Sequence, residues 1–177
     1  MGKGKLTLVL FLSVIFLLIF SMYRITQPRV LSTEEMKING FVKYGKYTEL
    51  RDFDLIDHNN LKFNKDNFEE SKLNFIYFGY TTCPTECPVM MSVMRSIYSK
   101  IDTESISFYL VSFDPEIDTT QRLKNYVTAF DEKFIGVTGE TPEILKLGYQ
   151  MGVERLEPSV DHQNHRVITH TNHLIAI

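Results

Sequence analysis

The fold is decided by residues 73–88, which read LNFIYFGYTTCPTECP. An apolar run rich in β-forming residues, Leu73–Tyr80, comes first and suits a central strand covered on both faces. A segment with apolar residues at helical spacing, 89–101, follows it. Between the two lie Cys83 and Cys87, the only cysteines of the chain. A strand-to-helix junction with two close thiols is a place for redox chemistry or for binding a soft metal.

Pro88 indicates where the helix begins. A proline inside a helix removes a hydrogen bond and clashes with the preceding turn, whereas the first turn tolerates it. We therefore expect the helix to begin near Cys87, with Cys83 in the turn before it. Both sulfurs would then lie near the positive end of the helix dipole, which favours thiolate. A purely structural disulfide is the weaker interpretation, because closing so short a loop contributes only about 2 kcal/mol.

Strands and helices alternate through the rest of the chain. The expected strands are 53–57, 61–63, 106–113, 134–137 and 166–177, of which the first two form a hairpin. The expected helices are 118–130, with Asp118 in its N-terminal cap signal, and a second one from 141 to 148 or 152. This alternation predicts an α/β sandwich with a largely parallel central sheet.

The N-terminal 24 residues differ from the rest. Lys3 and Lys5 precede Leu6–Tyr23, a stretch of 18 residues without a charge. As a helix it would reach roughly 27 Å, enough to span a bilayer core. No small-residue cleavage site follows, so an uncleaved anchor is favoured over a cleaved signal peptide. We expect an anchor over residues 1–24, a tether over 25–46 and one domain over 47–177.

The orientation of the anchor follows less directly. The positive charges on its two sides are nearly balanced, but a short tail whose charges stay inside would place the domain outside the cytoplasm. No Arg- and Ser-rich transit sequence precedes the anchor, which favours a bacterial inner membrane with the domain facing the periplasm. The net charge of -3 over 177 residues gives no support for nucleic-acid binding.

Four of the five histidines fall within twelve residues: His162, His165, His170 and His173. Two thiolates and one imidazole can bind Cu(II), and two thiolates alone can hold Cu(I). Zinc would normally take a fourth ligand or a water. The residues alone do not say which histidine would reach the thiols.

With these motifs the chain resembles the Sco/SenC family of membrane-anchored, thioredoxin-like copper proteins over roughly residues 50–177. Residues 77–88 resemble its CxxxCP loop, 111–119 its DPExDT segment and 134–139 its LxGLTG strand. Residues 168–171 resemble the stretch with its ligand histidine. The resemblance implies a thioredoxin-like fold, and copper, Cu(I) or Cu(II), bound by Cys83 and Cys87 with His170 as third ligand. It places Asp114 near the site in a secondary, tuning role. The other three clustered histidines match no ligand, which leaves surface positions or auxiliary copper capture.

The implied function is that of a copper metallochaperone for the CuA centre of cytochrome c oxidase. Its partners would be oxidase subunit II or another periplasmic cuproprotein, together with other copper chaperones or thioredoxin-like reductases. A thiol–disulfide reductase that keeps the cysteines of subunit II reduced is an alternative, and so is a copper or redox sensor. A Cys83–Cys87 disulfide would have to be reduced before copper could bind.

The C-terminus departs from the family pattern. Family members continue past the ligand histidine through a strand, a turn and a C-terminal helix. This sequence stops at Ile177, inside the expected strand. The C-terminal helix is therefore expected to be missing, with apolar side chains exposed on one sheet face.

Overall fold

The computed structural model describes residues 2–26, 31–42, 49–68, 70–101, 104–162 and 166–177. The chain divides into two compact units, residues 1–48 and 49–177. The first unit contains helix α1 (Lys3–Thr26) and the short helix α2 (Thr33–Ile38). Within α1, the 19 residues Leu8–Thr26 are long and apolar enough to cross a membrane.

Helix α2 lies where the sequence indicated only a tether. The Ser32 side chain accepts a hydrogen bond from the backbone N–H of Glu35, and the Glu35 carboxylate accepts one from the Ser32 N–H at 3.0 Å. This reciprocal capping box satisfies two backbone donors that a helix start leaves without partners. The Ser-x-x-Glu spacing was the signal for this helix.

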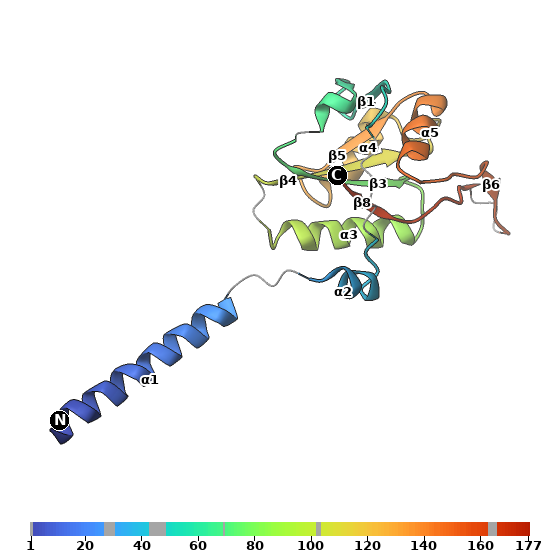
Figure 1. Cartoon of the computed structure of the whole chain (residues 1–177). Coiled ribbons are helices and arrows are strands. Elements are labelled where there is room, and N and C mark those ends of the chain that lie inside the picture. The colour runs from blue at the N-terminus through green and yellow to red at the C-terminus, as the bar shows by residue number, and fades with distance from the viewer. Residues whose placement is uncertain (1, 27–30, 43–48, 69, 102–103, 163–165) are drawn as a thin grey trace. The chain divides into compact units, whose positions relative to one another are not determined.

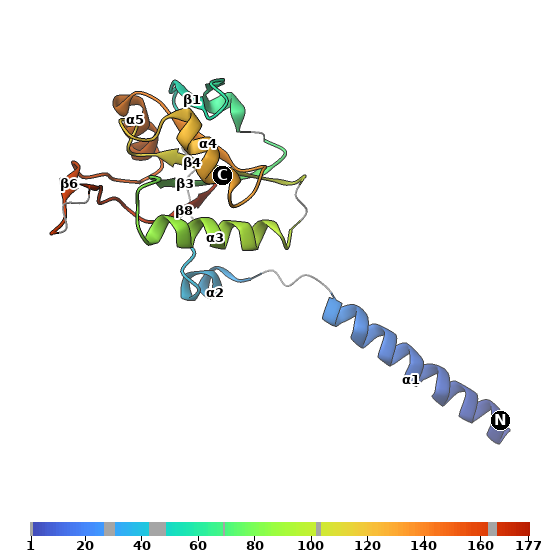
Figure 2. The same ribbon diagram turned by 180° about the vertical axis from the view of Figure 1, so that it is seen from behind.

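The second unit is an α/β domain, shown from opposite sides in Figures 1 and 2. Its strands are β1 (Leu55–Asp57), β2 (Lys62–Phe63), β3 (Leu73–Gly79), β4 (Ile106–Ser112), β5 (Ile135–Thr138), β6 (Ser159–Val160), β7 (Arg166–Val167) and β8 (Leu174–Ala176). Its helices are α3 (Glu86–Tyr98), α4 (Thr120–Thr128), α5 (Thr141–Gln150) and the 3₁₀ turn η1 (Lys65–Asn67).

Six strands form the main sheet, in the order β2-β1-β5-β4-β3-β8. The pairs β3–β4 and β4–β5 are parallel, whereas β1 and β8 join the sheet antiparallel. The expected parallel centre of the sheet is formed by β3, β4 and β5, and the strands on either side of them are antiparallel. Only the central strands are joined by crossover helices, which parallel pairing requires.

Helices cover both faces of this sheet. Tyr98 of α3 packs against Phe108 of β4, with ring centroids 5.7 Å apart. Helix α4 lies on the same face, because a Cβ at Gly136 of β5 would lie 2.9 Å from Cβ of Leu123. Two right-handed crossovers that step in the same direction across a sheet put both helices on one side. Helix α5 covers the other face, as Figure 1 shows.

The core confirms that β3 is a central, doubly covered strand. Ile76, Tyr77 and Phe78 are each 0% exposed. Consecutive residues of a strand point to opposite faces, so burial of all three requires cover on both. The chain therefore passes from the core directly into the loop with Cys83 at the carboxyl end of β3. In parallel α/β sheets, binding sites commonly form at the edge where the carboxyl ends of the strands lie.

The expected strand over 166–177 is two strands in the structure. Strand β7 pairs with β6 in a separate two-stranded sheet, and β8 pairs with β3, with Tyr77 opposite Leu174. A segment without regular structure joins β7 to β8 and contains His170, whose backbone forms an isolated antiparallel bridge with Arg155. In the described residues, no helix follows β8.

Candidate metal and thiol site

The two cysteines lie at the junction of β3 and α3. Helix α3 begins at Glu86, one residue before Cys87, which confirms the start expected from Pro88. Cys87 is 0% exposed and Cys83 is 8% exposed, and both are free thiols. The Cys87 backbone N–H donates to Sγ of Cys83 at 3.5 Å. The helix start thus holds Cys83 as the outer of two adjacent sulfurs.

The expectation that both sulfurs favour thiolate is wrong for Cys87. Burial raises the pKa of Cys87 to about 12, although the Tyr80 backbone hydrogen bond acts to lower it. Losing water costs a buried thiolate more than the helix start returns, because desolvation removes the hydration of a full charge, whereas the helix N-terminus supplies the equivalent of only about half a positive charge. Without a metal, Cys87 is therefore a protonated thiol.

His170 lies among three aromatic rings, of which those of Tyr77 and Tyr80 belong to residues that also contact the cysteines. Its ring centroid is 6.4 Å from that of Tyr77, 6.2 Å from Tyr80 and 5.4 Å from Phe113. The Tyr77 hydroxyl is 3.8 Å from Sγ of Cys87, and burial raises the pKa of both Tyr77 and Tyr80. The fold thus gathers a histidine from the end of the chain and the thiol pair around two tyrosines.

The ring nitrogens of His170 are not equivalent. Its Nδ1 lies 3.1 Å from the carbonyl oxygen of Thr171. A carbonyl only accepts, so this contact places the proton on Nδ1 and leaves the lone pair on Nε2. Metal-binding histidines commonly donate their second N–H in this way.

The three predicted ligands do not form a closed metal site here. Among the residues that the structure describes, no three His, Cys, Asp or Glu side chains stand together closely enough to hold a metal ion. His162 and His173 are exposed, and His165 lies outside the described residues.

Asp114 is fully buried two residues after the end of β4. Its Oδ1 forms an ion pair with Nη2 of Arg166 at 3.1 Å, and the same nitrogen lies 2.8 Å from Oε2 of Glu116. Neither carboxylate oxygen of Asp114 accepts an aligned hydrogen bond from the described residues. Burial raises the pKa of Asp114, and Arg166 opposes that rise.

Asp118 has a role that the sequence did not reveal. Thr119, not Asp118, is the N-cap of α4, and its side chain accepts from the Arg122 N–H at 3.2 Å. Asp118 instead accepts hydrogen bonds from the Thr81 N–H at 2.9 Å and the Ser112 hydroxyl at 2.6 Å. It therefore ties the loop before Cys83 to the end of β4.

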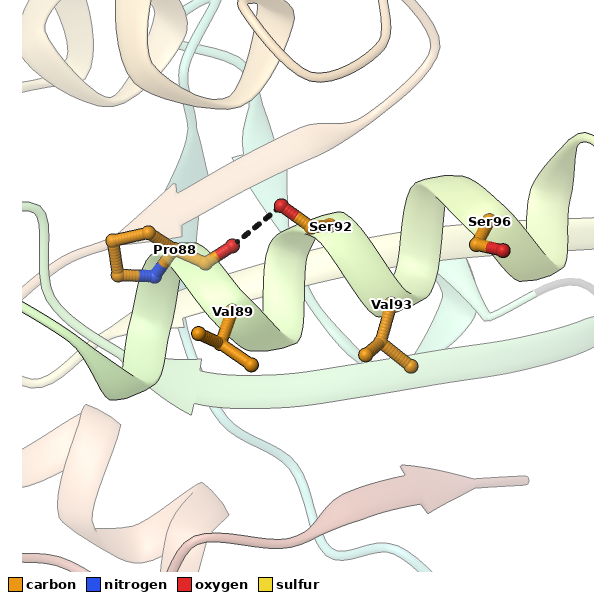
Figure 3. Close-up of a pocket in the computed structure, with 5 residues that line it drawn as sticks. All are labelled: Pro88, Val89, Ser92, Val93 and Ser96. Atoms are coloured by element: carbon orange, nitrogen blue, oxygen red, sulfur yellow. Dashed lines mark hydrogen bonds between the residues drawn. The ribbon is translucent and has the colours of Figure 1, made fainter.

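The outer face of α3 has a shallow hollow, shown in Figure 3. It is lined by Pro88, Val89, Ser92, Val93 and Ser96, and the Ser92 hydroxyl donates to the Pro88 carbonyl at 2.8 Å. Neither cysteine lines it. The thiols face the core side of the helix.

Fold and site together define a thioredoxin-like domain with two thiols at the start of the helix after its first central strand. The SCO1/SenC family profile matches residues 43–177, and the chain belongs to that family. It is similar to Arabidopsis thaliana ScoI, solved with copper bound, at a TM-score of 0.66 and 26% identity over 72% of this chain and 80% of that one. It is also similar to Bradyrhizobium japonicum ScoI, solved with copper bound, at a TM-score of 0.62 and 27% identity over 72% of this chain and 81% of that one.

Curated relatives extend the same pattern. The chain is 39% identical to a SCO2-like protein of Rickettsia conorii over 95 residues, and these residues cover 52% of this chain and 46% of that protein. It is 27% identical over 127 residues to a protein of Stutzerimonas stutzeri named as copper-binding, covering 70% of this chain and 61% of that protein. The chain thus spans about half to three fifths of the length of these relatives.

Proposed function

We propose that this chain is a copper metallochaperone that holds the metal through Cys83 and Cys87, with Nε2 of His170 as third ligand. Its cargo would go to the CuA centre of cytochrome c oxidase, through subunit II or another periplasmic cuproprotein. The observation that carries the proposal is the meeting of the thiol pair and His170 around Tyr77 and Tyr80. The copper-bound ScoI structures and the copper-binding relative support the choice of metal.

The donor set suits both oxidation states of copper. Two soft thiolates hold Cu(I), and an imidazole is needed more for Cu(II). The Nδ1 contact of His170 with Thr171 leaves Nε2 free to bind. Among the described residues, the three ligands do not stand close enough together to hold a metal ion. The His170 side chain therefore has to move toward the two thiols when copper binds. Binding must also displace the proton of Cys87.

The unequal exposure of the two sulfurs supports a second candidate, a thiol–disulfide reductase. Cys83 is the outer sulfur and would attack the disulfide of a partner, forming a mixed disulfide. The buried Cys87 would lose its proton and attack Cys83, releasing the partner as a dithiol and leaving a Cys83–Cys87 disulfide. Reduction of oxidase cysteines before copper transfer would use the same two residues.

The proposed location is a bacterial inner membrane, with α1 as a single anchor over residues 1–24 and the domain, residues 47–177, on the periplasmic side. The 19-residue, largely apolar span Leu8–Thr26 supports the anchor. The side of the membrane rests on the charges that flank it. Protease protection of the domain in intact spheroplasts, with full digestion after lysis, is expected for a cytoplasmic domain and would contradict this orientation.

Copper titration of the full chain in detergent tests the metal site. One copper per chain is expected for the wild type, and Cys83→Ser with Cys87→Ser should abolish tight binding. His170→Ala should weaken Cu(II) more than Cu(I), while His173→Ala, an exposed change on the same segment, should leave both unchanged. Tight stoichiometric binding by the double serine variant would overturn the proposal. Disulfide exchange that persists in His170→Ala would separate the reductase activity from metal delivery.

A further inference from the structure

Two tyrosine hydroxyls hold the segment with His170, one on each side of it. The Tyr80 hydroxyl accepts a hydrogen bond from the Ile168 backbone N–H at 3.3 Å. The Tyr77 hydroxyl donates to Oδ1 of Asn172 at 2.9 Å. Ile168 and Asn172 stand two residues before and two residues after His170. Between these two points the backbone on either side of His170 also pairs with residues 154–156, because the Leu156 N–H donates to the Thr169 carbonyl at 2.8 Å and the Thr171 N–H donates to the Glu154 carbonyl at 2.9 Å.

The same hydroxyl of Tyr77 reaches the thiol pair. This hydroxyl, which donates to the side-chain oxygen of Asn172, also lies 3.8 Å from Sγ of Cys87. The Asn172 amide also donates to Oε2 of Glu86, the first residue of α3, at 3.5 Å. Asn172 is therefore linked both to the thiol and to the start of the helix that contains it.

We infer that Tyr77 and Tyr80 are positioning residues that set the distance between His170 and the two thiols, and so set the preference of the site between Cu(II) and Cu(I). Of the three ligands, only His170 lies on the segment that these links hold, because Cys83 and Cys87 are fixed by the β3–α3 junction. This inference rests on the proposed copper site. Loss of the hydroxyls should therefore weaken the imidazole bond and leave the thiolate bonds in place.

Ring packing alone is the competing explanation. Both tyrosine rings contact the His170 ring, with centroids 6.4 and 6.2 Å from it. Replacement by phenylalanine keeps these contacts and removes only the hydroxyls. Tyr77→Phe and Tyr80→Phe, alone and together, thus separate the two explanations. Asn172→Ala cuts the Tyr77 link from an exposed position, where a folding defect is not expected.

The experiment uses the full chain in detergent and copper as the probe. Cu(II) affinity is followed by the sulfur-to-copper charge-transfer band and by nitrogen coupling in the EPR spectrum, and Cu(I) affinity by competition with a Cu(I) chelator. The double phenylalanine variant should lose about 10- to 100-fold in Cu(II) affinity, the range seen when partners of metal ligands are removed. Cu(I) affinity should fall much less. Without metal, the double phenylalanine variant should show faster amide exchange at Ile168 than the wild type does. Asn172→Ala should lower Cu(II) affinity in the same direction as the double phenylalanine variant.

Tyr109→Phe is the matched control. The Tyr109 hydroxyl donates to the Asn67 carbonyl at 3.2 Å, and its ring packs on Phe63 and Phe68 rather than on His170. This variant should leave the ratio of Cu(II) to Cu(I) affinity unchanged. If His170→Ala lowers Cu(II) affinity but the tyrosine and Asn172 variants change neither the ratio nor amide exchange, the inference is overturned and the copper site stands. If His170→Ala itself has no effect on Cu(II), the proposed third ligand is wrong.

Discussion

A Cβ placed on Gly79 would lie 2.9 Å from Sγ of Cys87, closer than side-chain carbons approach a neighbour in folded proteins. The same Cβ would lie 2.9 Å from Cε1 of Tyr77. Position 79, the last residue of β3, therefore has to be a glycine, because Sγ of Cys87 and the ring of Tyr77 already fill the volume that a Cβ would need. The Cys87 side chain cannot move out into solvent to relieve this contact, because it is fully buried, with 0% of its surface exposed.

Gly79→Ala should consequently destabilise the domain and displace the inner thiol. Overpacking of this kind costs about 1–3 kcal/mol in free energy of unfolding. Denaturant unfolding measures that cost. In a Cys87→Ala background, where the sulfur is absent, the penalty of Gly79→Ala should be smaller. An equal penalty in both backgrounds would show that the strain does not involve Cys87.

His58 should make stability depend on pH. It is 8% exposed, and its Nδ1 accepts the backbone N–H of Gly136 at 3.0 Å, so the folded domain needs the neutral ring. Burial lowers the pKa of His58 below its ordinary 6.5. The unfolded chain then binds the proton more readily, so this stabilisation is complete above pH 6.5 and is lost as pH falls through the folded pKa.

The measurement is the difference in free energy of unfolding between wild type and His58→Asn, taken at pH 7.5 and at pH 5. Asparagine can accept the Gly136 hydrogen bond but does not titrate. The wild type should therefore lose more stability than the variant on acidification. His173→Asn, an exposed substitution, is the control and should follow the wild type. Parallel loss in wild type and His58→Asn would mean that His58 does not titrate against folding.

Arg166 should stabilise the domain chiefly through the buried carboxylate of Asp114. Arg166→Met would leave that charge, 0% exposed, without its cation. Removing one partner of a buried pair typically costs about 3–5 kcal/mol, and partial exposure of Arg166 places the expected loss at the low end. Asp114→Asn in the Arg166→Met background should recover much of it. Glu116→Gln removes only the exposed partner and should cost less than about 1 kcal/mol. Equal effects of Arg166→Met with and without Asp114→Asn would contradict this account.

Much of the thiol site could be predicted from the sequence because it depends on local patterns. The apolar run before Cys83 and the proline after Cys87 fix the strand, the turn and the helix start. The ionisation of Cys87 could not be predicted, because burial is a tertiary property and outweighs the local helix dipole. His170 could not be chosen from its neighbours by residue type alone. Its place depends on contacts with Tyr77 and Tyr80, some 90 positions away along the chain.

The apolar helix α1 should hold the protein in the membrane uncleaved. Leu17 lies near the middle of the span Leu8–Thr26, and Tyr23 lies near its end. An arginine at the centre of a membrane helix costs about 2.5–3.5 kcal/mol on insertion scales, whereas near the end its side chain can reach the headgroups. Leu17→Arg should therefore reduce membrane retention in alkaline carbonate extraction, and Tyr23→Arg should not. Mass measurement of the extracted wild type should give the intact N-terminus. A chain that begins after residue 24 would show that the segment is removed as a signal peptide.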